Sequence, residues 1–267
     1  MVDVSSVVAL HVYPVKGCRG VTLDTARVER RGLAHDRRWM LVDGDGKFVT
    51  QRTEPRLARI EVAIEGEALI LSTEGHGALL VQRPPLEAPR RRVRVWSDEV
   101  DAVDAGTDVA EWLCGVLGSE TSLVFMPETT SRPVRPEYGR PDDVVSFADA
   151  LPLLFTTLAS LDELNARMRQ PLPMNRFRPN IVVQGTAPWA EDGWTHVRVG
   201  ELGVRVVKAC DRCVVTTTDQ LTGARGVEPL RTLSTFRERE RKVYFGVNAI
   251  PNVTGTIRVG DAVTVPG

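Results

Sequence analysis

Short runs rich in valine and isoleucine recur along the whole chain, separated by glycine, aspartate and proline. These runs have the length of β-strands, and their β-branched side chains suit a pleated sheet. They cover residues 7–12, 38–42, 60–64, 68–71, 92–96, 181–183, 196–199, 204–207 and 262–265. The sequence Asp43-Gly44-Asp45-Gly46 between two runs predicts a β-hairpin. We therefore expect a mainly β protein with barrel-like sheets, because a closed sheet leaves no open edge.

Helical signals are fewer than strand signals. The segments with helical patterning are 109–117, 160–168 and 229–237. Asp108 is placed to cap the first segment, and Gly118 to end it. The second opens with Ser160 followed by Glu163, which is the pattern of a capping box. Pro229 stands in the first turn of the third, where proline is tolerated.

The length of 267 residues fits one large domain or two modest ones. A segment rich in proline and charge, 126–143, lies between the first helix and a second apolar stretch. We place a domain boundary near its start, giving domains 1–122 and 123–267. The expected fold class is α+β, mainly β with a few helices.

The overall charge excludes some classes of protein. With 34 Lys and Arg against 35 Asp and Glu, the net charge is -1. This balance argues against a broad surface for nucleic acid or membranes, but it is compatible with a local basic pocket. No segment approaches the ~20 apolar residues of a membrane span, and no basic leader precedes a long apolar core. The chain's four cysteines are too few and too scattered for a disulfide framework. We expect a cytoplasmic protein without a self-contained iron–sulfur domain.

The pair Cys210-x-x-Cys213 has several interpretations. A zinc site needs two more ligands, and the other cysteines and the four histidines form no second pair. A thioredoxin-like pair should open a helix, but β-branched residues flank this one. One thiolate could instead bind a soft metal, and two inert buried cysteines also fit the spacing. Because residues three apart on a strand face opposite sides, we expect a bend at Asp211 and Arg212, one thiol facing a pocket and the other packing.

Three segments place cations in stiff or glycine-rich turns. Arg178 and Asn180 flank a proline ahead of a strand, which suits recognition of a phosphate or a flat heterocycle. The alternative is an arginine paired with an acidic neighbour and an asparagine that closes a turn. Lys16 lies at a glycine-rich turn that can hold an anion but lacks the spacing of a P-loop. Of Arg37 and the arginine that follows it, we expect one to pair with a carboxylate and one to lie along the strand.

The order of these motifs is more specific than any one of them. They are Tyr-Pro-Val-Lys-Gly, Asp-Arg-Arg-Trp, Asn-Arg-Phe-Arg-Pro-Asn, Cys-Asp-Arg-Cys-x-x-Thr-Thr and Gly-x-x-x-Val-Gly-Asp. This order resembles the MOSC family, in which a MOSC N-terminal β-barrel domain precedes a MOSC domain. The arrangement is that of mitochondrial amidoxime-reducing components and of the C-terminal part of molybdenum cofactor sulfurases. The resemblance covers the chain from about residue 7 to residue 265.

The resemblance implies that the chain binds the molybdenum cofactor, a pterin dithiolene with a terminal phosphate. It implies that Cys213 binds molybdenum while Cys210 does not, and that Asp211, the second expected catalytic residue, handles protons or orients its neighbours. A thiolate suits a metal already held by soft dithiolene sulfurs. The residues implied in cofactor binding are Lys16, Gly17, Arg37, Leu151, Arg178, Asn180, Asp211, Arg212 and Asn248.

The resemblance also implies an activity, the reduction of N–O bonds in small N-hydroxylated substrates such as amidoximes. The electrons would come from a separate protein, namely a ferredoxin, a cytochrome b5-like protein or a flavin reductase. No nucleic acid and no membrane is expected as a partner. The alternative is a carrier of the cofactor or of a persulfide that has no reductase activity. A zinc or redox protein that kept the fold without the cofactor is the third hypothesis.

Overall fold

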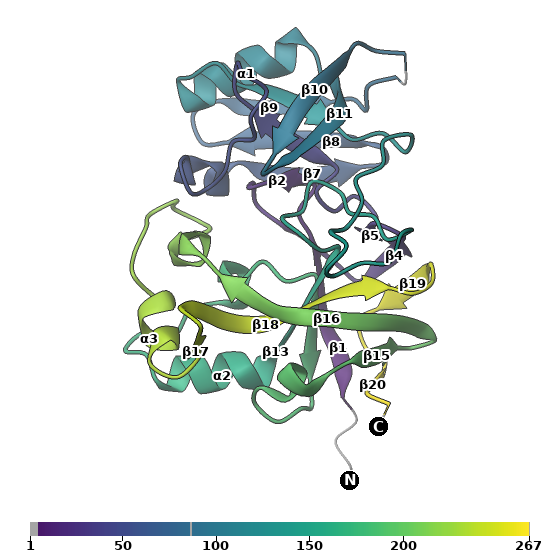
Figure 1. Ribbon diagram of the computed structural model, residues 1–267. Helices are drawn as coiled ribbons and strands as arrows, with labels where there is room; N and C mark the ends of the chain where they lie inside the picture. Colours follow the sequence, from purple (N-terminus) through teal and green to yellow (C-terminus); the bar gives the residue numbers. More distant parts are fainter. Residues whose placement is uncertain (1–4, 86, 267) are drawn as a thin grey trace.

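The computed structural model describes residues 5–85 and 87–266, so the ends of the predicted domains, at 1 and 267, lie outside the described residues. Figure 1 shows a large sheet in the lower half of the molecule and smaller sheets above it. Three α-helices accompany them: α1 (Thr107–Leu117), α2 (Leu158–Ala166) and α3 (Leu230–Ser234). The 3-10 helices are η1 (Pro55–Arg59), η2 (Met174–Arg176), η3 (Ala190–Gly193) and η4 (Val214–Thr217). The expectation of a mainly β fold with a few helices is confirmed.

The large sheet has nine strands in the order β20-β15-β16-β18-β13-β14-β1-β3, with β17 also pairing with β18. Its strands are β1 (Ser6–Val12), β3 (Val21–Leu23), β13 (Leu153–Thr157), β14 (Ile181–Gln184), β15 (His196–Val199), β16 (Leu202–Arg212), β17 (Glu238–Arg239), β18 (Lys242–Pro251) and β20 (Val263–Thr264). Most of these strands come from the second half of the chain. Strands β1 and β3 come from the first half. They belong to the large sheet because β1 pairs antiparallel with both β14 and β3.

The smaller sheets have the orders β10-β11-β12-β6-β2, β7-β8-β9 and β19-β4-β5. Their strands are β2 (Val15–Lys16), β4 (Thr25–Glu29), β5 (Gly32–Leu33), β6 (Trp39–Val42), β7 (Glu61–Glu65), β8 (Ala68–Thr73), β9 (Gly77–Val81), β10 (Arg90–Val95), β11 (Asp98–Asp104), β12 (Ser122–Phe125) and β19 (Gly255–Arg258). Within the described residues, the strand orders are open and no sheet closes into a barrel. The boundary between 122 and 123 stays a prediction; it falls on β12, which pairs with β6 and β11.

The helix caps differ from those expected. Gly106, not Asp108, precedes α1, and Asp108 lies in the first turn of that helix. Gly118 ends α1 with a φ of 67°, as expected for a left-handed C-terminal cap. Thr157 caps α2, because its hydroxyl accepts a hydrogen bond from the Ser160 amide, so the predicted capping box at Ser160 is wrong. Thr157 is also the last residue of the buried strand β13, so the sequence pattern did not indicate it as a helix cap.

Two main apolar cores hold the molecule together. One lies on the large sheet and joins residues from both halves of the chain, including Leu10, Phe155 and Val204. The other packs α1 and η1 against the upper strands, with Leu57 and Leu113 fully buried. Burial of each large side chain of this kind contributes about 1.5–3 kcal/mol. The two halves therefore share one of their cores.

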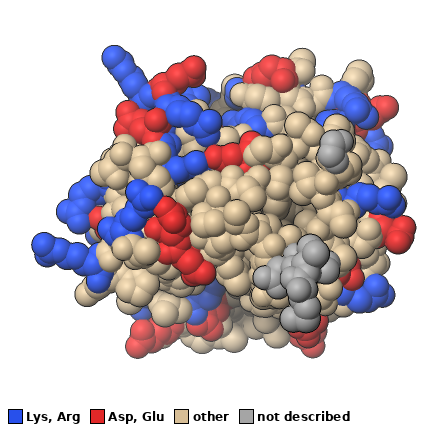
Figure 2. All heavy atoms as spheres, turned by 90° about the horizontal axis from the view of Figure 1, so that it is seen from below, with Lys and Arg blue, Asp and Glu red and all other residues tan. Residues whose placement is uncertain are grey.

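Within the described part of the chain, no helix is both long and apolar enough to cross a membrane. Figure 2 views the lower end of the molecule, where acidic and basic side chains alternate around a mostly uncharged centre. On the described part of this face there is no broad basic surface of the kind that binds nucleic acid.

Candidate functional site

A pocket of about 460 Å³ lies where loops from the upper sheets meet the end of β16 and the start of its partner strand β18. All ten site residues expected from the sequence line it: Lys16, Gly17, Arg37, Leu151, Arg178, Asn180, Asp211, Arg212, Cys213 and Asn248. They come from positions as far apart as 16 and 248, and both halves of the chain contribute. Their roles are considered below, after their contacts.

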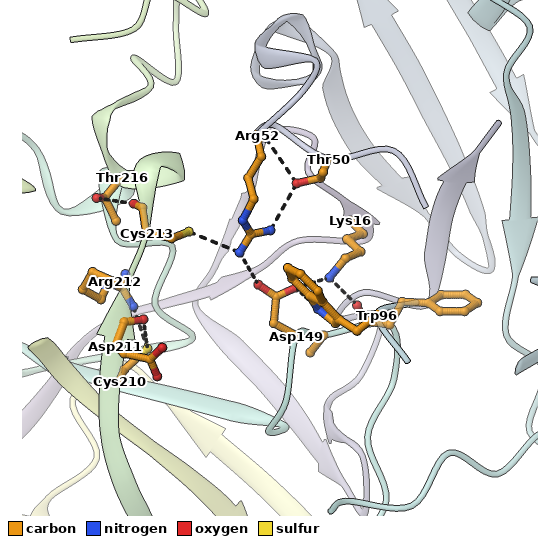
Figure 3. A network of polar contacts seen from close by, with 12 residues as sticks. Lys16, Thr50, Arg52, Trp96, Asp149, Cys210, Asp211, Arg212, Cys213 and Thr216 are labelled. Carbon is orange, nitrogen blue, oxygen red and sulfur yellow. Dashed lines mark hydrogen bonds and ion pairs between the residues drawn. The ribbon is translucent and has the colours of Figure 1, made fainter. Parts of the chain in front are cut away.

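Cys213 directly follows the last residue of the long strand β16 and precedes the 3-10 helix η4 as its N-cap. Its carbonyl accepts hydrogen bonds from the amide and the hydroxyl of Thr216, at 3.1 and 2.9 Å, which fix the turn. The sulfur points toward Arg52, whose Nη2 donates to Sγ at 3.2 Å (Figure 3). A guanidinium is a fitting donor for a thiolate, the form of cysteine that binds soft metals.

Cys210 lies on the same strand and also lines the pocket. The expected bend at Asp211 and Arg212 is wrong, because β16 continues through both residues and neither thiol is packed away. The register between β16 and β18 shifts on either side of Ala209, and Gly246 of β18 has a φ of 73° beside the second shift. Because of these irregularities, the side chains of β16 do not alternate strictly between the two faces of the sheet, as the expectation of a bend required. The Cys210 sulfur accepts a hydrogen bond from Arg212 at 2.9 Å.

Asp149 connects the side chains of Lys16, Arg52 and Trp96 on one wall of the pocket, as Figure 3 shows. It pairs with the Lys16 ammonium and with Arg52 at 3.5 Å, and it accepts a hydrogen bond from the Trp96 ring nitrogen at 3.2 Å. The Lys16 side chain is buried and also donates to the Phe147 carbonyl at 2.8 Å. Burial lowers the pKa of Lys16. Burial raises the pKa of Asp149, but the charges of Lys16 and Arg52 outweigh it and hold that pKa well below its usual value.

Two guanidiniums stack on Tyr13 at the inner end of the pocket. Arg37 and Arg178 lie 4.3 and 4.1 Å from the centre of its ring. Arg37 pairs with Asp36 at 2.5 Å. Arg178 donates to the Cys18 carbonyl at 2.8 Å, and it has no carboxylate within ion-pair distance among the described residues. Burial lowers the pKa of Arg178 to about 10, as expected for a cation that has lost water without gaining an anion.

Arg38, which follows Arg37, pairs with Glu128 at 2.7 Å. The expectation that only one of these two arginines pairs with a carboxylate is therefore wrong. The acidic partner of Arg38 lies 90 residues away in sequence. No local pattern could have indicated this contact.

Asn180 is buried, and its amide is used within the protein. It donates to the His11 carbonyl at 3.2 Å and accepts from the Leu154 amide at 3.1 Å and from Arg37 at 3.3 Å. These bonds join β1, β13 and the turn that holds Arg37. These contacts join segments that are distant in sequence, so the side chain of Asn180 does not close a local turn, and Asn180 also borders the pocket.

Arg212 offers a second cation without a carboxylate partner among the described residues. Its guanidinium donates to Cys210 and to the Phe177 carbonyl, and its buried Nε has no hydrogen-bond partner. Asp211 beside it pairs with Lys208 at 3.0 Å. Partial burial raises the pKa of Asp211, but the hydrogen bond and the charge of Lys208 lower it further, so the net shift is downward.

Gly17, Leu151 and Asn248 complete the expected set. Gly17 has a φ of 87°, and an added Cβ would meet Leu57 at 2.9 Å, so a side chain is excluded there. Leu151 is buried, and Asn248 donates to the Leu153 carbonyl at 3.4 Å. These three residues shape the wall of the pocket and bring no charge to it.

Sequence reasoning missed several residues that line the pocket. Arg52, Asp149, Trp96 and Arg176 all border it. Arg176 pairs with Asp219 at 2.8 Å and is held by the loop that follows Cys213. In sequence, nothing distinguished Arg52 from a solvated surface arginine. The one signal that could have indicated Asp149 was its place immediately before the segment that includes Leu151.

The zinc interpretation of the cysteines lacks a ligand set. In residues 5–85 and 87–266, no three His, Cys, Asp or Glu side chains are grouped so that they could hold a metal ion. All four cysteines are free. A cofactor that brings its own soft ligands needs only one thiolate from the protein.

Two family models match the chain. The MOSC N-terminal beta barrel domain matches residues 4–120, and the MOSC domain matches residues 142–264. The human mitochondrial amidoxime-reducing component 1 is 35% identical to this chain over 99% of the chain and 84% of the human protein. The human mitochondrial amidoxime reducing component 2 is 35% identical over 98% of this chain and 83% of its own length. The Xenopus laevis component 1 is 36% identical over 98% and 82%.

Proposed function

The chain belongs to the MOSC family, and from this premise we propose that it is a molybdenum-cofactor-binding oxidoreductase that reduces N-hydroxylated substrates. One observation carries the proposal. A single pocket contains the Cys213 thiol and two cations, Arg178 and Arg212, that have no carboxylate partner among the described residues. The names of the relatives, amidoxime-reducing components, support the same reaction class.

The residues present fit the chemistry of the cofactor. A terminal phosphate carries a charge of about -1.5 to -2 and needs several donors. Among the described residues, Arg178 has no carboxylate partner, and the buried Nε of Arg212 has no hydrogen-bond partner. Both groups can therefore donate to a phosphate. Gly17 allows close backbone approach, and Cys213 supplies the soft ligand. We therefore assign Cys213 as the metal ligand and Arg178, Arg212, Arg37 and Gly17 to cofactor binding.

Lys16 and Asn180 belong to the proposed set in a supporting role. Lys16 pairs with Asp149, which also holds Arg52 against Cys213. Asn180 fixes Arg37 through its amide oxygen. Both side chains act mainly by positioning a neighbour, since their polar atoms are already bonded within the protein. Leu151 and Asn248 border the same space.

When bound, the cofactor would supply the two-electron chemistry that cleavage of an N–O bond requires. An amidoxime takes up two electrons and two protons and gives an amidine and water. Cys213 would hold the reacting centre, and Arg52 orients the Cys213 sulfur through its hydrogen bond. Asp211 pairs with Lys208 at 3.0 Å, so we assign it the orientation of Lys208.

The partner and the location remain parts of the proposal. The electrons would come from a separate ferredoxin, cytochrome b5-like protein or flavin reductase. The cytoplasmic location expected from the sequence stays a prediction, and the relatives are named as mitochondrial.

Metal and pterin analysis of purified protein tests the proposal, with Cys213→Ser beside Cys210→Ser as a matched control. We expect molybdenum content or activity to collapse in Cys213→Ser and to change less in Cys210→Ser. Equal effects would contradict the ligand assignment, and a wild type without molybdenum or pterin would contradict the proposal itself. Turnover of benzamidoxime with an artificial electron donor decides against a pure cofactor or persulfide carrier.

A further inference from the structure

The pocket carries far more positive than negative charge. Nine lysine and arginine residues line it, against two aspartates, Asp149 and Asp211. Five of the nine cations pair with carboxylates. Within the part of the chain that the structure describes, Arg135, Lys242, Arg178 and Arg212 have no carboxylate within ion-pair distance. A surplus of this size indicates anionic ligands.

The four unpaired cations form two sets that differ in exposure. Arg178 and Arg212 are partly buried and donate inward to main-chain carbonyls. Arg135 and Lys242 are exposed at the mouth of the pocket. The inner set matches the one terminal phosphate of the proposed cofactor, which leaves the outer set without an anion.

Two aromatic side chains, Trp96 and Tyr138, line the same pocket as the outer cations. Trp96 is 40% exposed, and its φ of 56° is unusual for a large residue, so the surrounding structure holds the ring in place against strain. Its ring nitrogen is bonded to Asp149, and Arg135 contacts the hydroxyl of the adjacent Ser97 at 3.4 Å. Tyr138 lines the same pocket, with the Lys208 ammonium 4.9 Å from its ring centre.

We propose that Arg135 and Lys242, with Trp96 and Tyr138, form an anion-binding rim for planar N-hydroxylated substrates that carry a carboxylate or phosphate. The inference rests on the proposed reductase function and names the substrate class of that same site. The rim is close to the expected reaction centre, because contacts lead from Trp96 through Asp149 and Arg52 to Cys213. On the other side, Val243, next to Lys242, pairs with Arg212 in the antiparallel pairing of β16 with β18.

A small ligand fits this rim better than a protein surface does. Trp96 and Tyr138 line the pocket itself, with the Arg52 guanidinium 4.6 Å from the ring centre of Trp96 and the Lys208 ammonium 4.9 Å from that of Tyr138. A conjugated amidoxime or N-hydroxylated heterocycle would contact the parts of these rings that the protein leaves uncovered. Arg135 and Lys242 would then meet a negative group at the far end of the same molecule.

The test compares benzamidoxime with 4-carboxybenzamidoxime, which differ by one carboxylate. Calorimetric binding to the cofactor-loaded protein at low ionic strength should favour the carboxylate by about fivefold to tenfold, on the order expected for two exposed charge pairs. The preference should fall as salt is added, because exposed charges are screened. It should be lost in the double variant Arg135→Gln/Lys242→Gln. Arg140→Gln, which changes an exposed arginine of the same loop outside the pocket lining, should keep it.

The outcomes separate the two proposals. Equal or undetectable affinities of the wild type for the two compounds overturn the rim, whatever the activity. A preference that survives in the double variant, or disappears in Arg140→Gln, also overturns it. A preference for the carboxylate without reduction of either compound supports the rim and contradicts the reductase. Thermal unfolding of each variant checks that the exposed substitutions leave the fold intact.

Discussion

Replacing Asp149 by asparagine removes the one carboxylate that Lys16 pairs with among the described residues. Only 9% of the Lys16 side chain is exposed, whereas 54% of the Asp149 side chain is. Removal of one partner of a fully buried pair costs about 3–5 kcal/mol, but solvent at the carboxylate screens this pair, so we expect about 1–2 kcal/mol of unfolding free energy. For a chain of this size that corresponds to a fall in Tm of about 2–8 °C.

The pH dependence of this loss follows from the pKa of Asp149. Burial raises that pKa, but Lys16 and Arg52 outweigh the effect and hold it below its usual value. A carboxyl whose pKa is lowered by folding stabilises the protein fully above its unfolded value, about 3.9, and progressively less as the pH falls. The stability gap between wild type and Asp149→Asn should therefore be constant near neutral pH and should narrow below about pH 4.

Urea unfolding at several pH values measures this gap. Asp142→Asn is the matched control, since it makes the same change at an exposed aspartate of the same segment that does not line the pocket. If Asp149→Asn is no more destabilising than Asp142→Asn, or if the gap widens in acid, the ion-pair reasoning is refuted.

Three further substitutions test packing around the site. Gly246→Ala places a Cβ 2.5 Å from the Phe155 carbonyl at a φ of 73°, so we expect a loss of about 2 kcal/mol or more, read as a lower urea midpoint. Gln51 and Gln220 exchange two buried amide hydrogen bonds of 3.1 Å. Either Gln→Leu change removes both of these bonds and should cost about 1–3 kcal/mol, and the double variant should cost less than the sum. Additive losses in this double-mutant cycle would contradict the pairing.

The local pattern predicted the positions of many strands well. The runs at 181–183 and 196–199 coincide with β14 and β15 to within a residue. It failed where tertiary contacts decide the outcome. Strand β16 was expected at 204–207 but extends to Arg212, because it pairs with β18 as far as Arg212. The bulges in that pairing depend on both strands together and cannot be predicted from the sequence of either one.

The residues of the candidate site came mainly from the resemblance, since spacing alone left Cys210 and Cys213 open to several interpretations. What neither the spacing nor the resemblance supplied is the network around Asp149. Arg52 and Asp149 meet across 97 residues of sequence, and neither lies in a recognisable motif. Such contacts depend on how loops are brought together by the core, and a single sequence does not encode that arrangement locally.

The pocket depends on both halves of the chain, which bears on how the predicted domains can work. Arg52 of the first half donates to Cys213 of the second, and Gln51 beside it is bonded to Gln220. Strand β1 of the first half is also built into the large sheet that contains β16, the strand that Cys213 directly follows. Since one core spans both halves, the guanidinium and the thiol are held by the same packed structure and not by a hinge. The two family models match separate segments, 4–120 and 142–264, but the chemistry proposed above needs residues from both.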